Sequence, residues 1–593
     1  MRLVQLAFAL LVAAPLAAGP QERVPGERWM RYVDPAEAGF DPRELEAAHA
    51  TWESLPSSAF LVIADGAVVA GWGDLERRFM CHSVRKSFMS ALYGIYYDRG
   101  EIELDKTLAD LGIDDEPDPL LESEKRARIV DLLQARSGVF HPAAYAGRTD
   151  SRPRGSEGPG RYFAYNNWDF NTLATILMQE VKVDVFQAFD EYFGRPLGMQ
   201  DWRVSDGYYH YQRELSKYPA YPFRMSARDA ARFGLLFARE GLWGEKKILS
   251  RHWVRRSTAL CSIDSDVMGY AYLWWVFREP RFERHGMVAA LGVGNQMIAA
   301  CPDSDLVFVN RANTYADQET PMGPLLDLIE AILDARKGTP SAEPRLVPLE
   351  DGARAAPVLA AGYEGLVGRW PVPPADLGLP AEDTCEVALS NGRLVWTMPG
   401  WGTFALDPQP DGSLLEEDSL QHYYPVRDAS GAFAGIATAQ EIADGAVSAA
   451  ARGQHERAAA LLARLPETEA ESAALARALV RAFEGDREGA VQAVGALARG
   501  DAARRVENSV NGVGYAFLQA DRAEDGLVLL EINTQVFPGS ANAWDSLAEA
   551  HMTLGHDDEA REFYRASLEL DANNANARAK LEQLDGRAAG TAK

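Results

Sequence analysis

Apolar residues at helical spacing follow a short polar motif near residue 83. The stripe consists of Val84, Phe88, Leu92 and Ile95. The stretch CHSVRKSFMS spans residues 81–90, and Gly100 is the expected end of the helix that it opens. Ser83 and Lys86 stand three residues apart, a spacing that brings two side chains together on one face of a helix. The pattern predicts a helix that begins at Ser83 and carries Lys86 one turn further.

The rest of the chain falls into regions with different patterns. In residues 28–337, strand-like runs near both ends flank helix-like segments, and Asp65-Gly66 marks an early two-residue hairpin. This order predicts an antiparallel sheet assembled from distant parts of the chain. Residues 338–360, rich in proline and alanine, are predicted to form a linker. Residues 361–436 have short apolar runs between turn signals, and we predict a small β domain there.

Residues 441–584 form a further region, which is helical and repeats. Val510 and Phe517 recur as Trp544 and His551, with a period of about 34 residues. This period resembles that of tetratricopeptide repeats. Such repeats usually present a groove to a protein partner, while the alternative is that they only cap the β domain.

The first residues have the pattern of a secretory signal peptide. Arg2 supplies a positive start, residues 3–12 are apolar, and small residues surround Gly19. We therefore predict that residues 1–19 direct export, to the periplasm or outside the cell, and are then removed. The stretch is short for a membrane span, and the alternative is a retained N-terminal anchor.

Composition argues against several classes of function. The 593 residues carry a formal net charge of −26, which disfavours nucleic acid and anionic membranes as partners. The cysteines have neither metal-ligand spacing nor a dense disulfide pattern, although one pair could bridge in an oxidising compartment. These cysteines are Cys81, Cys261, Cys301 and Cys385. We expect neither a metal nor an organic cofactor.

A serine and a lysine at this spacing can catalyse acyl transfer. A serine hydroxyl needs a neighbouring base, and a buried lysine can be that base because desolvation lowers the pKa of an ammonium group. The start of a helix adds N–H donors where an oxyanion develops. Downstream, Tyr165 and Asn167 precede an apolar helix. A phenol and an amide at this spacing could relay a proton and hold a substrate carbonyl.

In their order along residues 28–337, these motifs resemble those of the serine β-lactamase and penicillin-binding-protein superfamily. The closest likeness is to its class C, esterase and 6-aminohexanoate-dimer hydrolase branch. Its S-x-x-K motif matches Ser83 and Lys86, and its Y-x-N motif matches Tyr165 and Asn167. The run LLQARSG resembles the family's LLTHTSG. The resemblance implies an α/β (α+β) sandwich with a central antiparallel sheet, helices on both faces and the serine helix buried between lobes.

The third motif of this superfamily is usually K-T-G or H-x-G, and here only its glycine is matched. The corresponding place reads Ala290-Leu291-Gly292, so the cationic residue is missing. By the resemblance, the Val293 N–H joins the Ser83 N–H in an oxyanion hole. Gly292 and Val293 are therefore candidate substrate-binding residues.

Several neighbours of these motifs have plainer alternative roles. His82 adjoins Ser83 but is expected to point away from it. His285 or Arg284 could approach the place of the missing cation. Five aromatic residues could line a pocket, although core packing is their more common role. They are Tyr208, Tyr209, Tyr211, Trp274 and Trp275.

Together these features predict an exported serine hydrolase that cleaves an ester or amide through an acyl-enzyme at Ser83. Lys86 and Tyr165 would serve as base and proton relay, and Asn167 would bind the substrate. The expected substrate is a small ester, amide or peptide-like compound, and a protein partner could bind the repeats. The alternative is an exported binding or scaffold protein whose hydrolase-like region is inactive.

Overall fold

The computed structural model of the chain divides into two compact units. The first comprises Met1–Ala356 with Gly400–Thr403, and the second Pro357–Pro399 with Phe404–Lys593. The predicted signal peptide, residues 1–19, lies outside the described residues. No helix within the described residues is long and apolar enough to span a bilayer. The structure describes residues 23–145, 152–316, 318–352, 361–377, 379, 381, 383–390, 392–398, 402–428, 430–465, 470–500 and 502–591.

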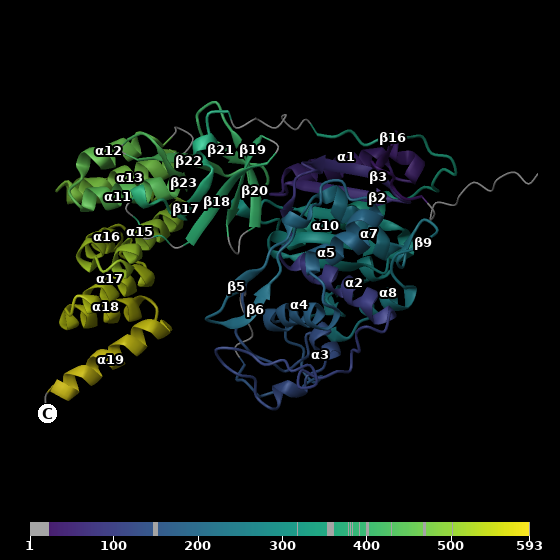
Figure 1. The fold of residues 1–593 in the computed structure, drawn as a ribbon, viewed down its shortest axis with the longest axis horizontal. Helices are drawn as coiled ribbons and strands as arrows, with labels where there is room; N and C mark the ends of the chain where they lie inside the picture. Colours follow the sequence, from purple (N-terminus) through teal and green to yellow (C-terminus); the bar gives the residue numbers. More distant parts are fainter. Residues whose placement is uncertain are drawn as a thin grey trace, which may run out of the picture. The chain divides into compact units, whose positions relative to one another are not determined.

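The first unit is built on a ten-stranded sheet (Figure 1). In spatial order its strands are β10 (Ser262–Ile263), β11 (Met268–Tyr270), β12 (Trp275–Phe277), β13 (Val288–Gly292), β14 (Gln296–Cys301), β15 (Leu306–Arg311), β2 (Ala59–Ala64), β3 (Ala67–Gly73), β1 (Met30–Tyr32) and β16 (Leu346–Pro348). Its centre joins distant segments, since β15 pairs with β2. The predicted antiparallel sheet needs one correction: β1 runs parallel to β3, so the sheet is mixed.

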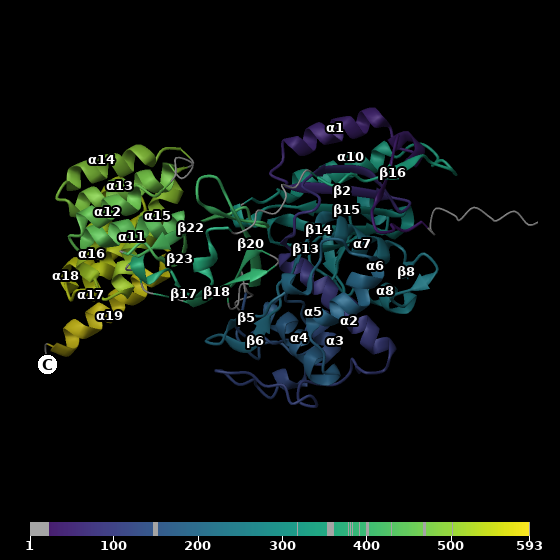
Figure 2. The same ribbon diagram turned by 45° about the horizontal axis from the view of Figure 1, so that its top comes forward.

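Helices cover both faces of this sheet (Figure 2). They are α1 (Pro42–Glu53) and α10 (Met322–Ala335) on one face, and α2 (Arg85–Asp98) and α7 (Ala227–Ala238) on the other. Successive side chains of a strand point to opposite faces. Accordingly, Phe60 and Val62 of β2 share a core with α1 and α10, whereas Leu61 and Ile63 share one with α2 and α7. The sequence-based α/β class is thereby confirmed.

Shorter elements complete the first unit. They are the helices α3 (Ile129–Leu133), α4 (Asn167–Val181), α5 (Val185–Phe189), α6 (Arg195–Leu197), α8 (Arg251–Thr258) and α9 (Pro280–Glu283), and the paired strands β4 (Phe79–Met80) with β7 (Arg224–Met225), β5 (His210–Gln212) with β6 (Ser216–Ala220), and β8 (Leu242–Trp243) with β9 (Lys246–Lys247). The start of α4 follows Tyr165, as the apolar pattern predicts.

The segment predicted as a linker, residues 338–360, contributes to the first unit. Its strand β16 pairs antiparallel with β1 at the edge of the large sheet. The Leu349 N–H donates to the Trp29 carbonyl over 2.7 Å, and the Asp351 carboxylate bonds Arg228 over 2.8 Å. These bonds attach the segment as far as Asp351, while residues 353–360 lie outside the description.

The second unit begins with a seven-stranded sheet. Its strands, in spatial as well as chain order, are β17 (Gly368–Val372), β18 (Asp383–Ser390), β19 (Arg393–Met398), β20 (Gly402–Pro408), β21 (Leu414–Glu416), β22 (His422–Arg427) and β23 (Phe433–Thr438). The first and last strands come close together, so the sheet is nearly closed. This architecture matches the β character predicted for residues 361–436.

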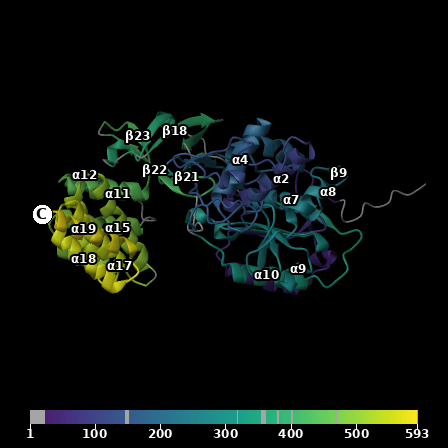
Figure 3. The same cartoon turned by 90° about the horizontal axis from the view of Figure 1, so that it is seen from below.

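Paired helices follow the sheet (Figure 3). They are α11 (Ala439–Ala451), α12 (His455–Leu462), α13 (Ala470–Phe483), α14 (Arg487–Leu497), α15 (Ala502–Gln519), α16 (Ala523–Val536), α17 (Ala541–Thr553), α18 (Asp557–Leu570) and α19 (Ala575–Thr591). Thr438 and Glu441 form a capping box at the start of α11. The predicted helical region is present, and its relation to tetratricopeptide repeats stays a prediction.

Candidate active site

Ser83 lies at the point where the chain enters α2. The turn His82–Val84 leads directly into this helix, whose residues Arg85–Tyr96 are all buried. The Lys86 Nζ is hydrogen-bonded to the Ser83 Oγ over 2.6 Å. The structure therefore brings together the serine and the lysine of the S-x-x-K motif.

The surroundings of Lys86 favour an uncharged amine. Burial first, and the nearby Arg85 charge second, hold the pKa of Lys86 well below its ordinary value. In the opposite direction, the ring faces of Tyr165 and Phe170, whose centres each lie 4.9 Å from the Lys86 Nζ, would attract an ammonium charge. An uncharged amine beside a hydroxyl can accept the hydroxyl proton, which is the task of a base in acyl transfer.

Tyr165 completes the contacts around the serine. Its phenol interacts with the Ser83 side chain, and its ring stacks on Trp275 with the centroids 5.6 Å apart. Burial raises the pKa of Tyr165 to about 12, although the interaction with Ser83 acts to lower it. At neutral pH this phenol keeps its proton, so it is suited to donate a proton and less suited to be the resting base.

Asn167 lies on the first turn of α4, and the two polar atoms of its amide have different surroundings. The Asn167 Nδ2 donates to the Tyr145 carbonyl over 2.5 Å, which fixes the orientation of the amide. The Asn167 Oδ1 is buried and has no hydrogen-bond partner among the described residues. An unpartnered acceptor beside Tyr165 could bind an N–H of a substrate.

Gly292 ends β13 directly against the serine. A Cβ atom at residue 292 would lie 2.5 Å from the Cys81 carbonyl oxygen and 3.0 Å from the Ser83 nitrogen. Only a residue without a side chain fits this approach. The backbone that leads from Gly292 into Val293 thus runs beside the Ser83 N–H, the arrangement that an oxyanion hole requires.

His82 adopts a left-handed backbone conformation, with φ of 47°, immediately before the nucleophile candidate. Its Nδ1 is hydrogen-bonded to the Tyr145 hydroxyl and its Nε2 to the Thr314 Oγ1, each over 2.8 Å. Burial, together with nearby cations, lowers the pKa of His82 to about 4. Tyr145 and Thr314 were not predicted, because no motif marks them and they meet His82 only in the fold.

The missing third-motif cation is not supplied by the segment before β13. The His285 Nδ1 is hydrogen-bonded to the Ser304 Oγ over 2.6 Å, and Arg284 pairs with Asp334 at 2.9 Å. Both lie beyond the end of β13 opposite to Gly292. The hypothesis that either residue replaces the cation is therefore wrong.

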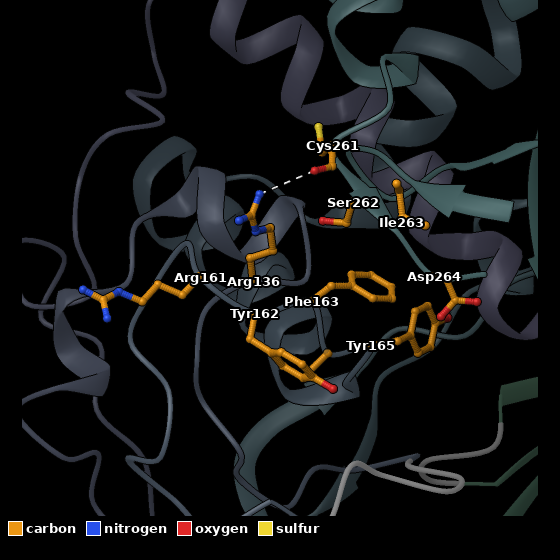
Figure 4. A pocket seen from close by; sticks show the side chains of 10 residues that line it. Arg136, Arg161, Tyr162, Phe163, Tyr165, Cys261, Ser262, Ile263 and Asp264 are labelled. Carbon is orange, nitrogen blue, oxygen red and sulfur yellow. Dashed lines mark hydrogen bonds between the residues drawn. The ribbon is translucent and has the colours of Figure 1, made fainter. Parts of the chain in front are cut away.

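A cavity of about 510 Å³ lies beside Tyr165 (Figure 4). Its lining residues are Arg136, Arg161, Tyr162, Phe163, Ala164, Tyr165, Cys261, Ser262, Ile263 and Asp264. Figure 4 shows Arg136 directed toward the Cys261 carbonyl, while Arg161 points away from the middle of the cavity. None of the five aromatic residues proposed from the sequence lines it, and Trp274 belongs to the core.

Other candidate chemistry is not found in the described part of the chain. All four cysteines are free, so the open possibility of a disulfide is not realised. Among the described residues, no group of histidine, cysteine, aspartate and glutamate could hold a metal ion.

Comparison with known proteins gives one family match. Residues 43–329 match the family model described as Beta-lactamase. No curated protein matches the chain.

Three solved structures illustrate the likeness. A β-lactamase from Mycobacterium bovis is 18% identical over 49% of this chain and 97% of its own, with a TM-score of 0.35. A penicillin-binding protein from Bacillus halodurans is 16% identical over 48% and 99%, with a TM-score of 0.37. A penicillin-binding-protein homologue from Pyrococcus abyssi is 15% identical over 65% and 96%, with a TM-score of 0.38. At such TM-scores these likenesses add nothing to the family match. It is that match alone which supports a β-lactamase-like region over residues 43–329.

Proposed function

We propose that this protein is an exported serine hydrolase that cleaves an ester or amide bond through an acyl-enzyme at Ser83. The observation that carries the proposal is the 2.6 Å contact between the Ser83 Oγ and the Lys86 Nζ in a buried setting. The family match over residues 43–329 supports the class of reaction. Export rests on the sequence of residues 1–19.

The proposed first step is attack of the Ser83 Oγ on the substrate carbonyl. Lys86 takes the hydroxyl proton, since burial lowers the pKa of its ammonium group and so favours the uncharged amine. The N–H groups of Ser83 and Val293 hold the oxyanion of the tetrahedral intermediate. The Gly292 contact with the Ser83 nitrogen supports this assignment.

Tyr165 then donates its proton to the leaving group as the carbon–heteroatom bond breaks. It recovers a proton from the Lys86 ammonium group, whose Nζ lies 4.9 Å from the Tyr165 ring centre, and water later hydrolyses the acyl-enzyme. The cavity beside Tyr165 offers room for a small substrate group, and the Asn167 Oδ1 offers an acceptor for a substrate N–H.

Fluorophosphonate labelling tests this proposal. The full-length protein is treated with a fluorophosphonate, digested, and the adduct is located by mass spectrometry. We expect modification of Ser83, loss of labelling in Ser83→Ala, and unchanged labelling in Ser90→Ala. Ser90 is a matched control because it is a buried serine on the same helix. The absence of any adduct would favour the inactive scaffold, and an adduct elsewhere would move the nucleophile.

A further inference from the structure

Arg85, between Ser83 and Lys86, is a fully buried cation without an anionic partner. Its side chain is 0% exposed, and its Nη2 donates to the Asn171 Oδ1 over 3.3 Å. Its Nε and Nη1 are buried and have no hydrogen-bond partner. Within the described residues, no carboxylate lies at ion-pair distance from this guanidinium.

Aromatic rings compensate this charge only in part. The Arg85 guanidinium carbon lies 4.7 Å from the ring centre of Tyr221 and 5.5 Å from that of Tyr145. A buried charge without a counter-ion is costly, and arginine cannot escape the cost by losing its proton. Other buried arginines have a counter-ion; Arg78, for example, bonds Asp206 at 2.9 Å.

Arg85 is 0% exposed, so its electric field is the most direct way for it to act on the site. In a medium of low dielectric constant, that field extends to the neighbouring titratable groups. They are Lys86 on α2, His82 in the turn that leads into α2, and, from other segments, Tyr145, Tyr165, Tyr208 and Tyr221. A further buried cation, Arg311 on β15, acts on His82.

Lys86 is the group for which this field bears most directly on the chemistry, because it adds to the effect of burial. The ring faces of Tyr165 and Phe170, each 4.9 Å from the Nζ, attract a positive charge and would favour an ammonium group. Arg85 opposes them, because a like charge disfavours protonation. We propose that Arg85 is a positioning residue whose buried charge, acting together with the burial of Lys86, favours the uncharged Lys86 amine that can take the Ser83 proton. The use of that amine rests on the proposed function.

Direct titration of Lys86 tests this inference without any substrate. The full-length protein carries ¹³C,¹⁵N-labelled lysine, and Lys86→Arg identifies the Lys86 resonance. We expect a Lys86 pKa in the wild-type protein well below the ordinary value of about 10.4. Both Arg85→Met and Arg85→Gln should raise it by about one pH unit or more, since they remove the charge while differing in hydrogen bonding. A wild-type Lys86 pKa near the ordinary value overturns the inference, even if neither variant folds.

A matched variant separates the charge of Arg85 from a general effect on folding. Arg311 is equally buried and also has no carboxylate partner among the described residues, but it bonds Cys81 and Gln296. Arg311→Gln should leave the Lys86 pKa within about half a unit of wild type. Equal shifts in the Arg85 and Arg311 variants, or no shift in either, contradict the specific role of Arg85.

The pH dependence of fluorophosphonate labelling provides the link to chemistry. The acidic midpoint of the labelling rate should move with the measured Lys86 pKa in Arg85→Gln. If Lys86 responds to Arg85 but Ser83 is never labelled, the electrostatic inference stands and the proposed function fails. If Ser83 is labelled with the same pH profile in wild type and Arg85→Gln, the proposed function stands and this inference fails.

Discussion

The two units differ in what they bury. In the second unit the largest core consists mainly of alanine, leucine and valine side chains. Every lysine or arginine that is buried among the described residues lies instead in the first unit. They are Arg78, Arg85, Lys86, Arg224, Arg228, Arg232, Arg239 and Arg311. The second unit buries acidic side chains such as Glu416 and Asp418, so the two units differ in buried basic side chains and not in buried charge as such. A buried cation is costly, and the buried basic side chains of the first unit include the two that flank the proposed chemistry, Arg85 and Lys86.

Within the first unit, buried arginines fall into two kinds. Arg228 and Arg239 form ion pairs, at 2.7 Å with Asp201 and at 2.9 Å with Asp305. Such pairs fix one segment of the fold to another. Arg85 has no such partner among the described residues and stands beside the nucleophile candidate. Arg228 and Arg239 therefore stabilise the fold, whereas the proposed effect of Arg85 is on the pKa of neighbouring groups.

The largest expected effect is on the nucleophile. Ser83→Ala should abolish hydrolysis of any substrate found, because loss of such a nucleophile typically costs on the order of 10⁶ in kcat. Thermal unfolding should be nearly unchanged, since Ser83 is not part of the buried core. The measurement is kcat together with a melting curve. Residual activity above about one per cent of wild type would mean that Ser83 is not the nucleophile.

The next effect concerns the approach of β13 to the serine. Gly292→Ala should lower the labelling rate of Ser83 by about 10²–10³, the usual effect of losing one oxyanion donor. The added Cβ would collide with the Cys81 carbonyl and the Ser83 nitrogen. Backbone strain is no obstacle, because φ at Gly292 is −143°. Gly323→Ala, at a glycine with open space around it, is the control. Equal rates in both variants would remove Gly292 from the site.

A smaller effect is expected in the choice of substrate. β-Lactams carry a carboxylate, and Ala290 and Leu291 stand where related enzymes have a cation. The missing charged hydrogen bond should cost about 1.5–3 kcal/mol, roughly 10- to 150-fold. We therefore expect kcat/KM for nitrocefin to be below that for a short-chain p-nitrophenyl ester on the same preparation. The reverse order would contradict this expectation and direct attention to Arg136 and Arg161 in the cavity.

The stability of the first unit should depend on pH through His82. Its pKa is about 4 in the folded protein and about 6.5 in the unfolded chain, so the unfolded chain binds more protons between these values. Stability is therefore lost as the pH falls from about 6.5 to 4, by at most about 2–3 kcal/mol. His82→Asn, which tolerates the left-handed backbone, should flatten this dependence. Melting curves at pH 7 and 4.5 measure it, with His49→Asn on α1 as control, and an unchanged slope counts against the assignment.

The smallest change in activity is expected from removal of the second unit. A chain that ends at Gly352 should hydrolyse small esters within a few-fold of the full-length rate, because Ser83, Lys86 and Tyr165 all precede that point. A chain that ends at Lys337 should melt at a lower temperature, since it lacks β16 and the bond from Leu349 to Trp29. Complete inactivity of a folded chain ending at Gly352 would mean that the second unit is needed for activity.

Part of the fold and of the candidate site could be predicted from local patterns and motifs. The helical stripe after Ser83 and the Asp65-Gly66 turn follow from short-range preferences, and the structure has both. The strand β16 was missed because its three residues stand in a segment of linker composition and are ordered only by pairing with β1. Arg85 could not be singled out either. Whether an arginine has a partner depends on segments distant in sequence, such as those that carry Asn171 and Tyr221.

The pairing of β2 with β15 also affects the order in which the first unit folds during synthesis. Ala59 stands opposite Arg311, and β13, which carries Gly292, joins the same sheet through β14. A chain made from its N-terminus therefore exposes Ser83 long before the strands that complete the oxyanion site exist. Sheets closed by such remote segments form slowly. The proposed chemistry is accordingly latent in the growing chain and begins only when the last third of the first unit has folded onto the first.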